Sequence, residues 1–435
     1  MSEEQLRMND FRSVGEEQSS DEMPVGYKKT EIGIIPEDWE VKQLGSFTHI
    51  RSRRVLPTNV DPETICIELE HIGQGNGRLC AYSKAVESES SKFLFFSGDI
   101  LFGRLRPYLK KFWFAKQNGI CSTEIWPLTV DTSDTHNKFF FYIVQTERFL
   151  EASEVSYGTH MPRADWKVLR ELQIAVPPFS EQRAIAEVLT DVDNLIESLD
   201  NLIRKKQAIK KATMQQLLTG RFRLPGFEGE WKSVTIGSLG SVYGGLSGKN
   251  KQDFGEGNAF YVTFLNVLQN IVIDPNQFER VSVPKGESQN IVRKGDLLFN
   301  GTSETPDELA MGAAVPDDFG ELYLNSFCFG FRIPDQVSWH PLFFAYLFRS
   351  CVGREMLRAL SQGATRHNLS KSQFLRLVVC VPNYLEQRAI TSILLDMDAE
   401  IEVLESRRDK IKQIKLGMMQ QLLTGRTRLL SKEAV

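Results

Sequence analysis

The stretch EQRAIAEVLTDVDNLIESLDNLIRKKQAIKKATMQQLLTGR, residues 181–221, decides the fold because nearly the same text returns 205 residues later. The second copy, residues 386–426, reads EQRAITSILLDMDAEIEVLESRRDKIKQIKLGMMQQLLTGR, and the two match at 22 of 41 positions without a gap. Such a match indicates an internal duplication. The chain is therefore predicted to consist of two halves, each a globular block followed by a long helix.

Both copies have the apolar spacing of a coiled-coil helix, with steps of three and four residues that line one stripe. Each copy ends at a glycine, Gly220 or Gly425, which can adopt the left-handed conformation that terminates a helix. Asn383, three residues before Glu386, has the spacing of a capping box. Two such stripes in one chain most simply bury each other, and a two-fold relation between the halves makes the helices antiparallel. The predicted seam consists of Ile185, Leu189, Val192, Ile196, Leu199, Ile203, Ile390, Leu394, Met397, Ile401 and Leu404.

The duplication also predicts the domain organisation. We expect an α+β fold in which two mixed α/β blocks are joined by two long antiparallel coiled-coil helices in a pseudo-two-fold internal repeat. The expected boundaries are 1–25 for an acidic tail, 26–178 for block 1, 179–221 for the first helix, 222–382 for block 2, 383–426 for the second helix and 427–435 for a C-terminal tail.

The two blocks share a plan. Short apolar alternations between glycine and polar turns are typical of strands, and GDILF at 98–102 in block 1 corresponds to GDLLF at 295–299 in block 2. The apolar stretch from Phe139 to Leu150 is predicted to be helical. Each block closes on a glycine-led turn, an amphipathic segment and a last strand. A shared frame with divergent loops is what we expect of two domains that do the same job on different targets.

Composition and charge limit the classes of protein to which this chain can belong. The chain has 435 residues, 41% of them hydrophobic, without an apolar run long enough to span a membrane, so we expect a cytoplasmic protein with two cores. The six cysteines are scattered, which suits a reducing compartment and argues against a zinc site. The net charge is −4, but residues 1–25 carry seven acids against two arginines. We expect this segment to be a disordered tail, and any nucleic-acid surface on the near-neutral remainder to be local.

Several of these motifs together resemble a known family. The EQRAI opening and MQQLLTGR close of each helix, the GIIPEDWE entry at 33–40 and the GDILFGRLRPYLKK segment at 98–111 resemble the specificity subunit of type I restriction-modification enzymes. The resemblance covers nearly the whole chain from about Gly26. The acidic tail, and Leu385 in place of Ser180 of the first copy, depart from the family's pattern.

The resemblance implies a non-catalytic role. Each block is then a target-recognition domain that reads one half of a bipartite site in double-stranded DNA. The helices then set the spacing and dock two DNA methyltransferase subunits, which direct adenine N6 methylation, while restriction subunits join the complex. The chain itself is expected to bind no cofactor or metal, with S-adenosylmethionine, ATP and magnesium held by the partner subunits.

Basic and polar residues near strand ends and turns are the candidates for DNA contact. Arginine and lysine can grip phosphates or pair with guanine edges, and neighbouring aromatic rings such as Tyr108 can pack or wedge. Arginine and asparagine in the closing turns suit guanine and adenine edges. For each residue the alternative is an ordinary solvated charge or a turn-stabilising contact. The candidates are Arg51, Arg53, Arg54, Arg104, Arg106, Lys110, Lys111, His160 and Arg163 in block 1, and Lys249, Lys251, Ser303, Arg366, His367 and Asn368 in block 2.

Other patterns point away from catalysis by this chain. Val176-Pro177-Pro178-Phe179 resembles the motif of amino-methyltransferases, but the side chain of Val176 cannot accept a hydrogen bond from a target amine. The segment GLSGKN at 245–250 lacks the hydroxyl residue and first glycine of a phosphate loop. The basic runs on the helices suit the helix dipole and a solvated face. The remaining alternatives are a scaffold whose blocks bind proteins and, less favoured, a stand-alone methyltransferase.

Overall fold

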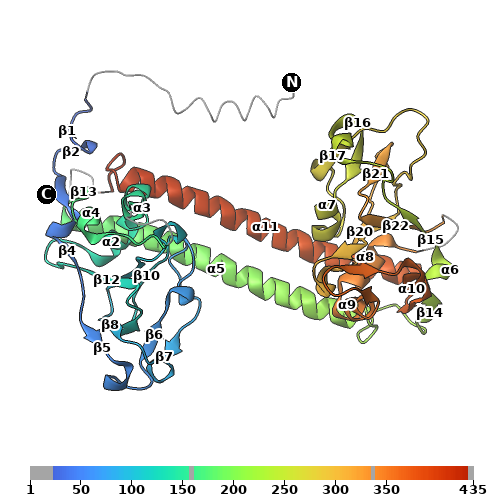
Figure 1. The fold of residues 1–435 in the computed structure, drawn as a ribbon, viewed down its shortest axis with the longest axis horizontal. Helices are drawn as coiled ribbons and strands as arrows, with labels where there is room; N and C mark the ends of the chain where they lie inside the picture. Colours follow the sequence, from blue (N-terminus) through green and yellow to red (C-terminus); the bar gives the residue numbers. More distant parts are fainter. Residues whose placement is uncertain (1–22, 156–160, 335–338, 430–435) are drawn as a thin grey trace. The chain divides into compact units, whose positions relative to one another are not determined.

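Two long helices, α5 (Phe179–Leu217) and α11 (Tyr384–Leu422), occupy the two copies of the duplicated text (Figure 1). The computed structural model describes residues 23–155, 161–334 and 339–429, so the predicted acidic tail up to residue 22 and residues 430–435 lie outside it. Gly220 and Gly425, just beyond the helix ends, have φ angles of 69° and 73°, which a side chain would disfavour. Among the helices of the described residues, none is both long and apolar enough to cross a membrane.

The predicted capping box before α11 forms only in part. The Asn383 side chain accepts a hydrogen bond from the Glu386 N–H at 3.0 Å, as the spacing predicts. The Glu386 carboxylate, however, accepts from the Arg223 guanidinium at 2.6 and 2.7 Å. A stronger, charged donor has therefore replaced the reciprocal backbone contact.

The chain forms two compact units, residues 1–198 with 408–435 (unit 1) and residues 199–407 (unit 2). Each unit contains one block, the start of the long helix that follows it, and the end of the other long helix. Inside unit 1, Asp193 of α5 pairs with Lys415 of α11, and Glu181 pairs with Arg428 beyond the end of α11. Because an early position of one helix faces a late position of the other, the helices run antiparallel.

Block 1 contains two larger sheets and two strand pairs. The four-stranded sheet is antiparallel, and the five-stranded sheet contains one parallel pair, β11 with β6. The strands, in sheet order, are β10 (Phe112–Phe114), β9 (Ile100–Gly103), β12 (Ile125–Val130) and β4 (Thr48–Ile50); β5 (Arg54–Val55), β8 (Lys92–Phe95), β11 (Gly119–Cys121), β6 (Ile65–Ile67) and β7 (Ser83–Lys84); the hairpin β1 (Tyr27–Thr30) and β2 (Gly33–Pro36); and β13 (Gln173–Val176) with β3 (Glu40–Gln43).

The four-stranded sheet of block 1 is buried on both faces, which explains its unbroken apolar runs. Ile100 and Phe102 of β9 pack with the helices α2 (Asn137–Ile143) and α3 (Glu147–Glu154), while Leu101 packs with the five-stranded sheet. The stretch 139–150, predicted to be helical, forms two helices and not one, because Thr146 is extended and accepts a hydrogen bond from the Phe149 N–H to start α3. The last helix of the block, α4 (Trp166–Leu169), leads into β13.

Block 2 repeats the layered arrangement with different loops. Leu297 and Phe299 of its four-stranded sheet pack with the helices, whereas Leu298 packs with a three-stranded sheet. The strands, in sheet order, are β15 (Ser241–Gly244), β22 (Cys328–Arg332), β18 (Leu297–Asn300) and β20 (Gly312–Ala314); β17 (Phe278–Val281), β16 (Phe254–Val262) and β21 (Leu322–Leu324); β19 (Thr302–Ser303), β24 (His367–Leu369) and β23 (Ser361–Gln362); and β14 (Lys232–Thr235) with β25 (Val378–Val381). The helices are α6 (Ile236–Leu239), α7 (Phe264–Gln269), α8 (Pro341–Arg349), α9 (Cys351–Arg358) and α10 (Lys371–Arg376).

The predicted seam residues are buried or half-buried, but they do not all serve the helix pair alone. Ile185 and Leu189 belong to the core of block 1, together with Leu422 and Leu423 from the end of α11. Ile390 and Leu394 belong in the same way to the core of block 2. The start of each helix is therefore part of a block's core. Buried seam positions beyond it are Ile196, Leu199, Ile203 and Ile401, and half-buried ones are Val192, Met397 and Leu404.

Inside each unit, the start of one copy of the repeat binds an arginine just beyond the end of the other copy. In unit 1 the buried Glu181 carboxylate accepts hydrogen bonds from Trp39 Nε1 at 2.9 Å and from Arg428 at 2.7 and 2.8 Å. In unit 2 the buried Glu386 is bound by Arg223, which stands at the same place in the other copy. In each unit the glutamate of one EQRAI motif thus binds the arginine that lies two residues beyond the LLTGR motif of the other helix.

A second repeated contact joins each block to both helices. In unit 1 the Tyr142 hydroxyl of α2 donates to Asp193 at 2.9 Å, and Lys415 pairs with that carboxylate at 2.7 Å. In unit 2 the Tyr346 hydroxyl of α8 donates to Asp398 at 2.6 Å, and Lys210 pairs with Asp398. These two Tyr–Asp–Lys triads hold each block in a defined orientation on the helix pair of its own unit.

Candidate nucleic-acid interface

In block 1 the chain after β9 runs beside the closing turn of the block. Leu105 forms a β-bridge with Arg163, and the Ala164 N–H donates to the Arg104 carbonyl at 2.8 Å. This pairing brings Arg104, Arg106 and Arg163 together, although they are far apart in sequence. His160, another predicted contact of the same turn, lies outside the described residues.

One carboxylate holds two of these arginines. Arg163 binds Glu124 through Nε and Nη2 at distances between 2.9 and 3.2 Å, and Arg104 Nε lies 3.9 Å from the same carboxylate. The hydrogen bonds from Arg163 lower the pKa of Glu124, so the carboxylate stays ionised. Arg104 also lies over the Trp126 ring at 5.3 Å. Because two cations share one anion, the surface keeps a positive charge.

The remaining basic residues of this segment differ in exposure and in side-chain contacts. Lys111 Nζ donates to the Leu69 carbonyl at 2.6 Å and is half-buried. Arg106 and Lys110 are exposed, and within the described residues neither side chain forms an ion pair or a hydrogen bond. They flank a short 3-10 turn, η5 (Pro107–Leu109), whose Tyr108 is 48% exposed. Two exposed cations of block 1 thus flank this one turn.

The other predicted arginines of block 1 lie between the end of β4 and the start of β5. Arg51 is bound by the buried Asp99 at 2.9 Å and stacks on Phe96 at 4.7 Å, so it has a structural contact. Arg53 and Arg54 are exposed, with Arg54 over the Phe93 ring at 5.6 Å. In the part of block 1 that the structure describes, no hydrogen bond or ion pair joins these three to the 104–111 segment.

In block 2 the two predicted clusters meet on one small sheet. Ser303 of β19 is paired with His367 of β24, and Thr302 with Asn368. His367 Nδ1 lies 2.9 Å from the Ser361 hydroxyl, while Asn368 is exposed and donates to the Arg366 carbonyl at 3.3 Å. Segments more than sixty residues apart therefore present Asn368 and Arg366 beside the chain that follows β18.

The lysines near the glycine-rich loop of block 2 are placed differently from each other. Lys249 forms an ion pair with Glu287 at 2.6 Å, and its side chain is only 4% exposed. The hydrogen bond from Lys249 lowers the pKa of Glu287. Lys251 is exposed in a 3-10 turn that Asn250 caps. Of the two, Lys251 is the one that a phosphate could reach.

In block 2 the structure shows exposed aromatic residues, which the sequence did not single out, beside arginines. Phe327 is 53% exposed, and the Arg366 guanidinium lies 5.2 Å above its ring. Phe260 and Arg280 form a similar exposed pair across β16 and β17, at 5.0 Å. An aromatic residue on the polar side of a strand alternation, as at Phe260, was the available signal. Arginine stacked on an exposed ring is well suited to nucleic acids.

Comparison with known proteins assigns the chain to a family. The model of the type I restriction modification DNA specificity domain matches residues 36–210 and again residues 228–413. The chain belongs to this family. Among its relatives, the type I restriction enzyme MjaVIII specificity subunit of Methanocaldococcus jannaschii is 26% identical over 415 residues, which cover 91% of this chain and 94% of the relative.

Two solved structures share the fold of this specificity subunit. A chain from a type I R-M system, solved to explain complex assembly and conformational transition, has a TM-score of 0.56 at 19% identity, covering 90% of this chain and 99% of that one. The type I restriction-modification S subunit of M. genitalium has a TM-score of 0.55 at 15% identity, covering 88% and 96%. The predicted α+β fold, with two mixed blocks and two long antiparallel helices in an internal repeat, is confirmed.

Membership of the type I specificity family makes this chain a non-catalytic subunit concerned with DNA sequence specificity, as the sequence predicted. The described residues contain no group of three or more His, Cys, Asp or Glu side chains that could hold a metal ion. A pocket of about 390 Å³ lies between α2 and α5 in unit 1.

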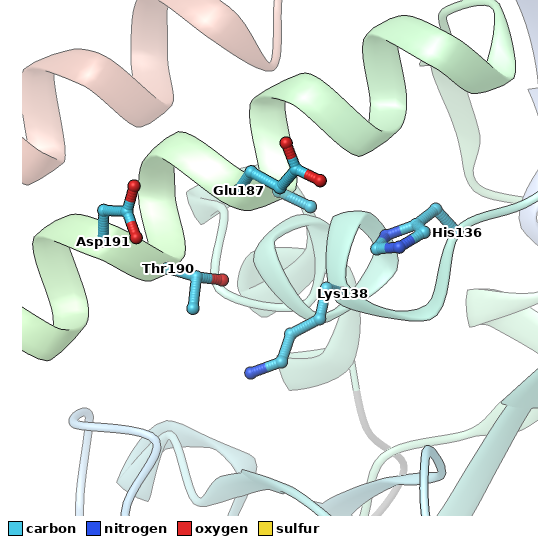
Figure 2. Close-up of a pocket in the computed structure, with 6 residues that line it drawn as sticks. His136, Lys138, Glu187, Thr190 and Asp191 are labelled. Atoms are coloured by element: carbon cyan, nitrogen blue, oxygen red, sulfur yellow. The ribbon is translucent and has the colours of Figure 1, made fainter.

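This pocket has no catalytic arrangement. Figure 2 shows His136 and Lys138 at α2 on one side and Glu187, Thr190 and Asp191 of α5 on the other. Burial lowers the pKa of His136 and of Lys138, whose Nζ lies 4.2 Å above the Phe114 ring. No hydrogen bond joins the five labelled side chains to one another in the described structure, so the pocket offers no base held against a nucleophile.

Proposed function

We propose that each block of this specificity subunit reads one half of a bipartite site on double-stranded DNA. The observation that carries the proposal is that both blocks pair the same two segments. In both blocks the segment after the GDILF or GDLLF strand is held by hydrogen bonds against the closing turn, at Leu105 with Arg163 and at Ser303 with His367. Loops set on a rigid frame are where recognition residues concentrate. The same frame carries different side chains in each block, as two different half-sites require.

The long helices would set the distance between the half-sites and dock two methyltransferase subunits. The Tyr142–Asp193–Lys415 and Tyr346–Asp398–Lys210 triads support this part, because they fix each block to the helices of its own unit. The chemistry would belong to the partners. The methyltransferase subunits would bind S-adenosylmethionine and methylate adenine at N6, and restriction subunits would use ATP and magnesium. The complex would work in the cytoplasm, where the DNA lies.

The test is a genome-wide map of N6-methyladenine in the host, with the gene intact and with it deleted. We expect a split motif, two short specified parts around an unspecified spacer, to disappear on deletion. Deletion without any change in methylation, in a host that expresses the chain and its methyltransferase partner, would contradict the proposal and favour a scaffold that binds proteins.

The spacing role has its own test. Removing one heptad from each helix keeps the apolar stripe in register and shortens the helices by about 10 Å, which is about 3 base pairs of B-DNA. We expect the methylated motif to keep both half-sites and to lose about that length from its spacer. An unchanged spacer in a stably folded variant would refute the idea that the helices act as a ruler.

A further inference from the structure

The turn at residues 106–110 in block 1 has a strained backbone. Arg106 and Lys110 have φ angles of 51° and 50°, and they are two of the three non-glycine residues with positive φ in the described chain. Glycine or asparagine would adopt this conformation more easily. Such strain persists only where the surrounding structure enforces it, and it is concentrated at binding sites.

Neighbouring segments enforce this conformation through backbone contacts. The Arg106 N–H donates to the Pro162 carbonyl at 2.8 Å, and the Lys110 carbonyl accepts from the Gly75 N–H at 2.9 Å. Pro107, inside the turn, is buried. Both ends of the turn are therefore fixed by backbone contacts, while the side chains of Arg106, Tyr108 and Lys110 stay exposed.

The side chains of the turn face solvent as a small cationic surface. Tyr108 is 48% exposed between Arg106 and Lys110, and its hydroxyl has no hydrogen bond within the described structure. Beside the turn, Arg104 and Arg163 share the carboxylate of Glu124, and Lys111 donates to the Leu69 carbonyl. An exposed aromatic ring between unpaired cations complements a polyanion that has stackable bases.

We propose that residues 106–110 form a preformed DNA-contact turn, which rests on the proposed function of block 1. Arg106 and Lys110 bind phosphates, and Tyr108 contacts a base of the half-site that block 1 reads, which makes Tyr108 a specificity-determining residue. Because the turn is already fixed, little conformational entropy is lost when it meets the duplex.

The corresponding turn of block 2 has the opposite charge, so this contact belongs to one half-site. After β19 the 3-10 turn Pro306–Glu308 carries Asp307 and Glu308, and Arg358 pairs with Asp307. Two carboxylates at that position disfavour a phosphate contact. Block 2 must contact the DNA phosphates through other residues.

The phosphate contacts are tested by salt titration of the full chain with a random-sequence duplex. We expect Arg106→Asn with Lys110→Asn to lower the slope of log K against log salt by about 2, since each phosphate contact contributes about 0.9. Lys116→Asn removes an exposed lysine of the same block outside the turn and should leave the slope unchanged. Arg106→Gly separates binding from folding, because it removes the cation while relieving the strain. It should bind several-fold more weakly and be at least as stable as the parent chain. An unchanged slope in the double variant overturns the phosphate contacts.

The base contact is tested by methylation mapping in hosts that carry Tyr108→Ala or Tyr108→Phe. We expect Tyr108→Ala to relax one position of one half-site and leave the other half-site intact, while Tyr108→Phe retains the motif. Tyr82→Ala, at an exposed tyrosine outside the turn, is the matched control and should keep the parent motif. A Tyr108→Ala map identical to that of the parent overturns this inference alone, whereas a parent chain that yields no split motif overturns the proposed function.

Discussion

At the scale of single residues, the buried carboxylates Glu181 and Glu386 tie the start of each copy of the repeat to the chain just beyond the other copy. A buried carboxylate is costly unless charged or polar donors satisfy it. The Glu181 carboxylate accepts hydrogen bonds from Trp39 and Arg428, and the Glu386 carboxylate accepts them from Arg223. The glutamate begins one helix and the arginine follows the other, so neither can change without affecting its partner. Asp38 strengthens the contact in unit 1 by binding Arg428 at 2.7 and 2.9 Å.

Removing the arginine should therefore destabilise unit 1. We expect Arg428→Ala to lower the free energy of unfolding by about 2–3 kcal/mol, somewhat less than for a fully buried pair because Arg428 is partly exposed. Urea denaturation of the purified chain measures this loss. Arg426→Ala, at an exposed arginine two residues earlier, is the matched control and should change stability by less than about 0.5 kcal/mol. Equal effects of the two substitutions would show that the Glu181 contact contributes nothing specific.

At the scale of elements, α2 and α8 begin at equivalent histidines that lie against the long helices. The backbone N–H of His136 donates to the Gln182 side chain at 2.8 Å, and that of His340 to Gln387 at 3.0 Å. In both rings the buried Nδ1 has no partner within the described structure. Burial lowers the pKa of both side chains below the ordinary value of 6.5, because the desolvated imidazolium is disfavoured.

This geometry predicts a loss of stability in mild acid. Well above the ordinary pKa of about 6.5, both histidines are neutral in the folded and in the unfolded chain. As the pH falls, the unfolded chain binds protons first, so the folded state loses stability until the folded-state pKa values are passed. We expect thermal unfolding midpoints to fall between about pH 7 and pH 5, and His136→Gln with His340→Gln to flatten this dependence. His49→Gln, at an exposed histidine, is the control. A double variant with the parent's pH profile would exclude these two residues as the cause.

The elements also show what the sequence could and could not predict. Helices α5 and α11 follow from local signals, the apolar stripe and the terminal glycines, which act whatever the tertiary fold. The pairing of Ser303 with His367, and the burial of Lys249 against Glu287, depend on how distant segments meet. No local pattern encodes these contacts. The division of the stretch 139–150 into α2 and α3 is different, because it rests on a local contact, the cap that Thr146 forms on α3. Candidate residues were therefore found by type and position, while their freedom to bind had to come from the structure.

At the scale of the whole molecule, the duplication yields two units with separate cores. The core of unit 1 contains block 1, the start of α5 and the end of α11, and that of unit 2 contains block 2, the start of α11 and the end of α5. Each unit repeats the carboxylate–arginine contact and the Tyr–Asp–Lys triad. Each block is held by its own carboxylate–arginine contact and its own Tyr–Asp–Lys triad. Replacing one block therefore leaves these contacts of the other block intact.

Because each block is held by separate contacts, we predict that each block recognises its half-site independently of the other block. Exchanging residues 26–176 for the corresponding block of a relative keeps Glu181, Asp193 and the whole of α11. The relative is chosen so that its block carries a tryptophan and a tyrosine at the positions of Trp39 and Tyr142. We expect the methylated motif to change in one half only, with the other half and the spacer retained. The reciprocal exchange of residues 227–381 should change the opposite half. A single exchange that changes both halves of the motif, in a chain that is folded and assembles with its partners, would mean that the two units read DNA together. That result would contradict the independence of the blocks.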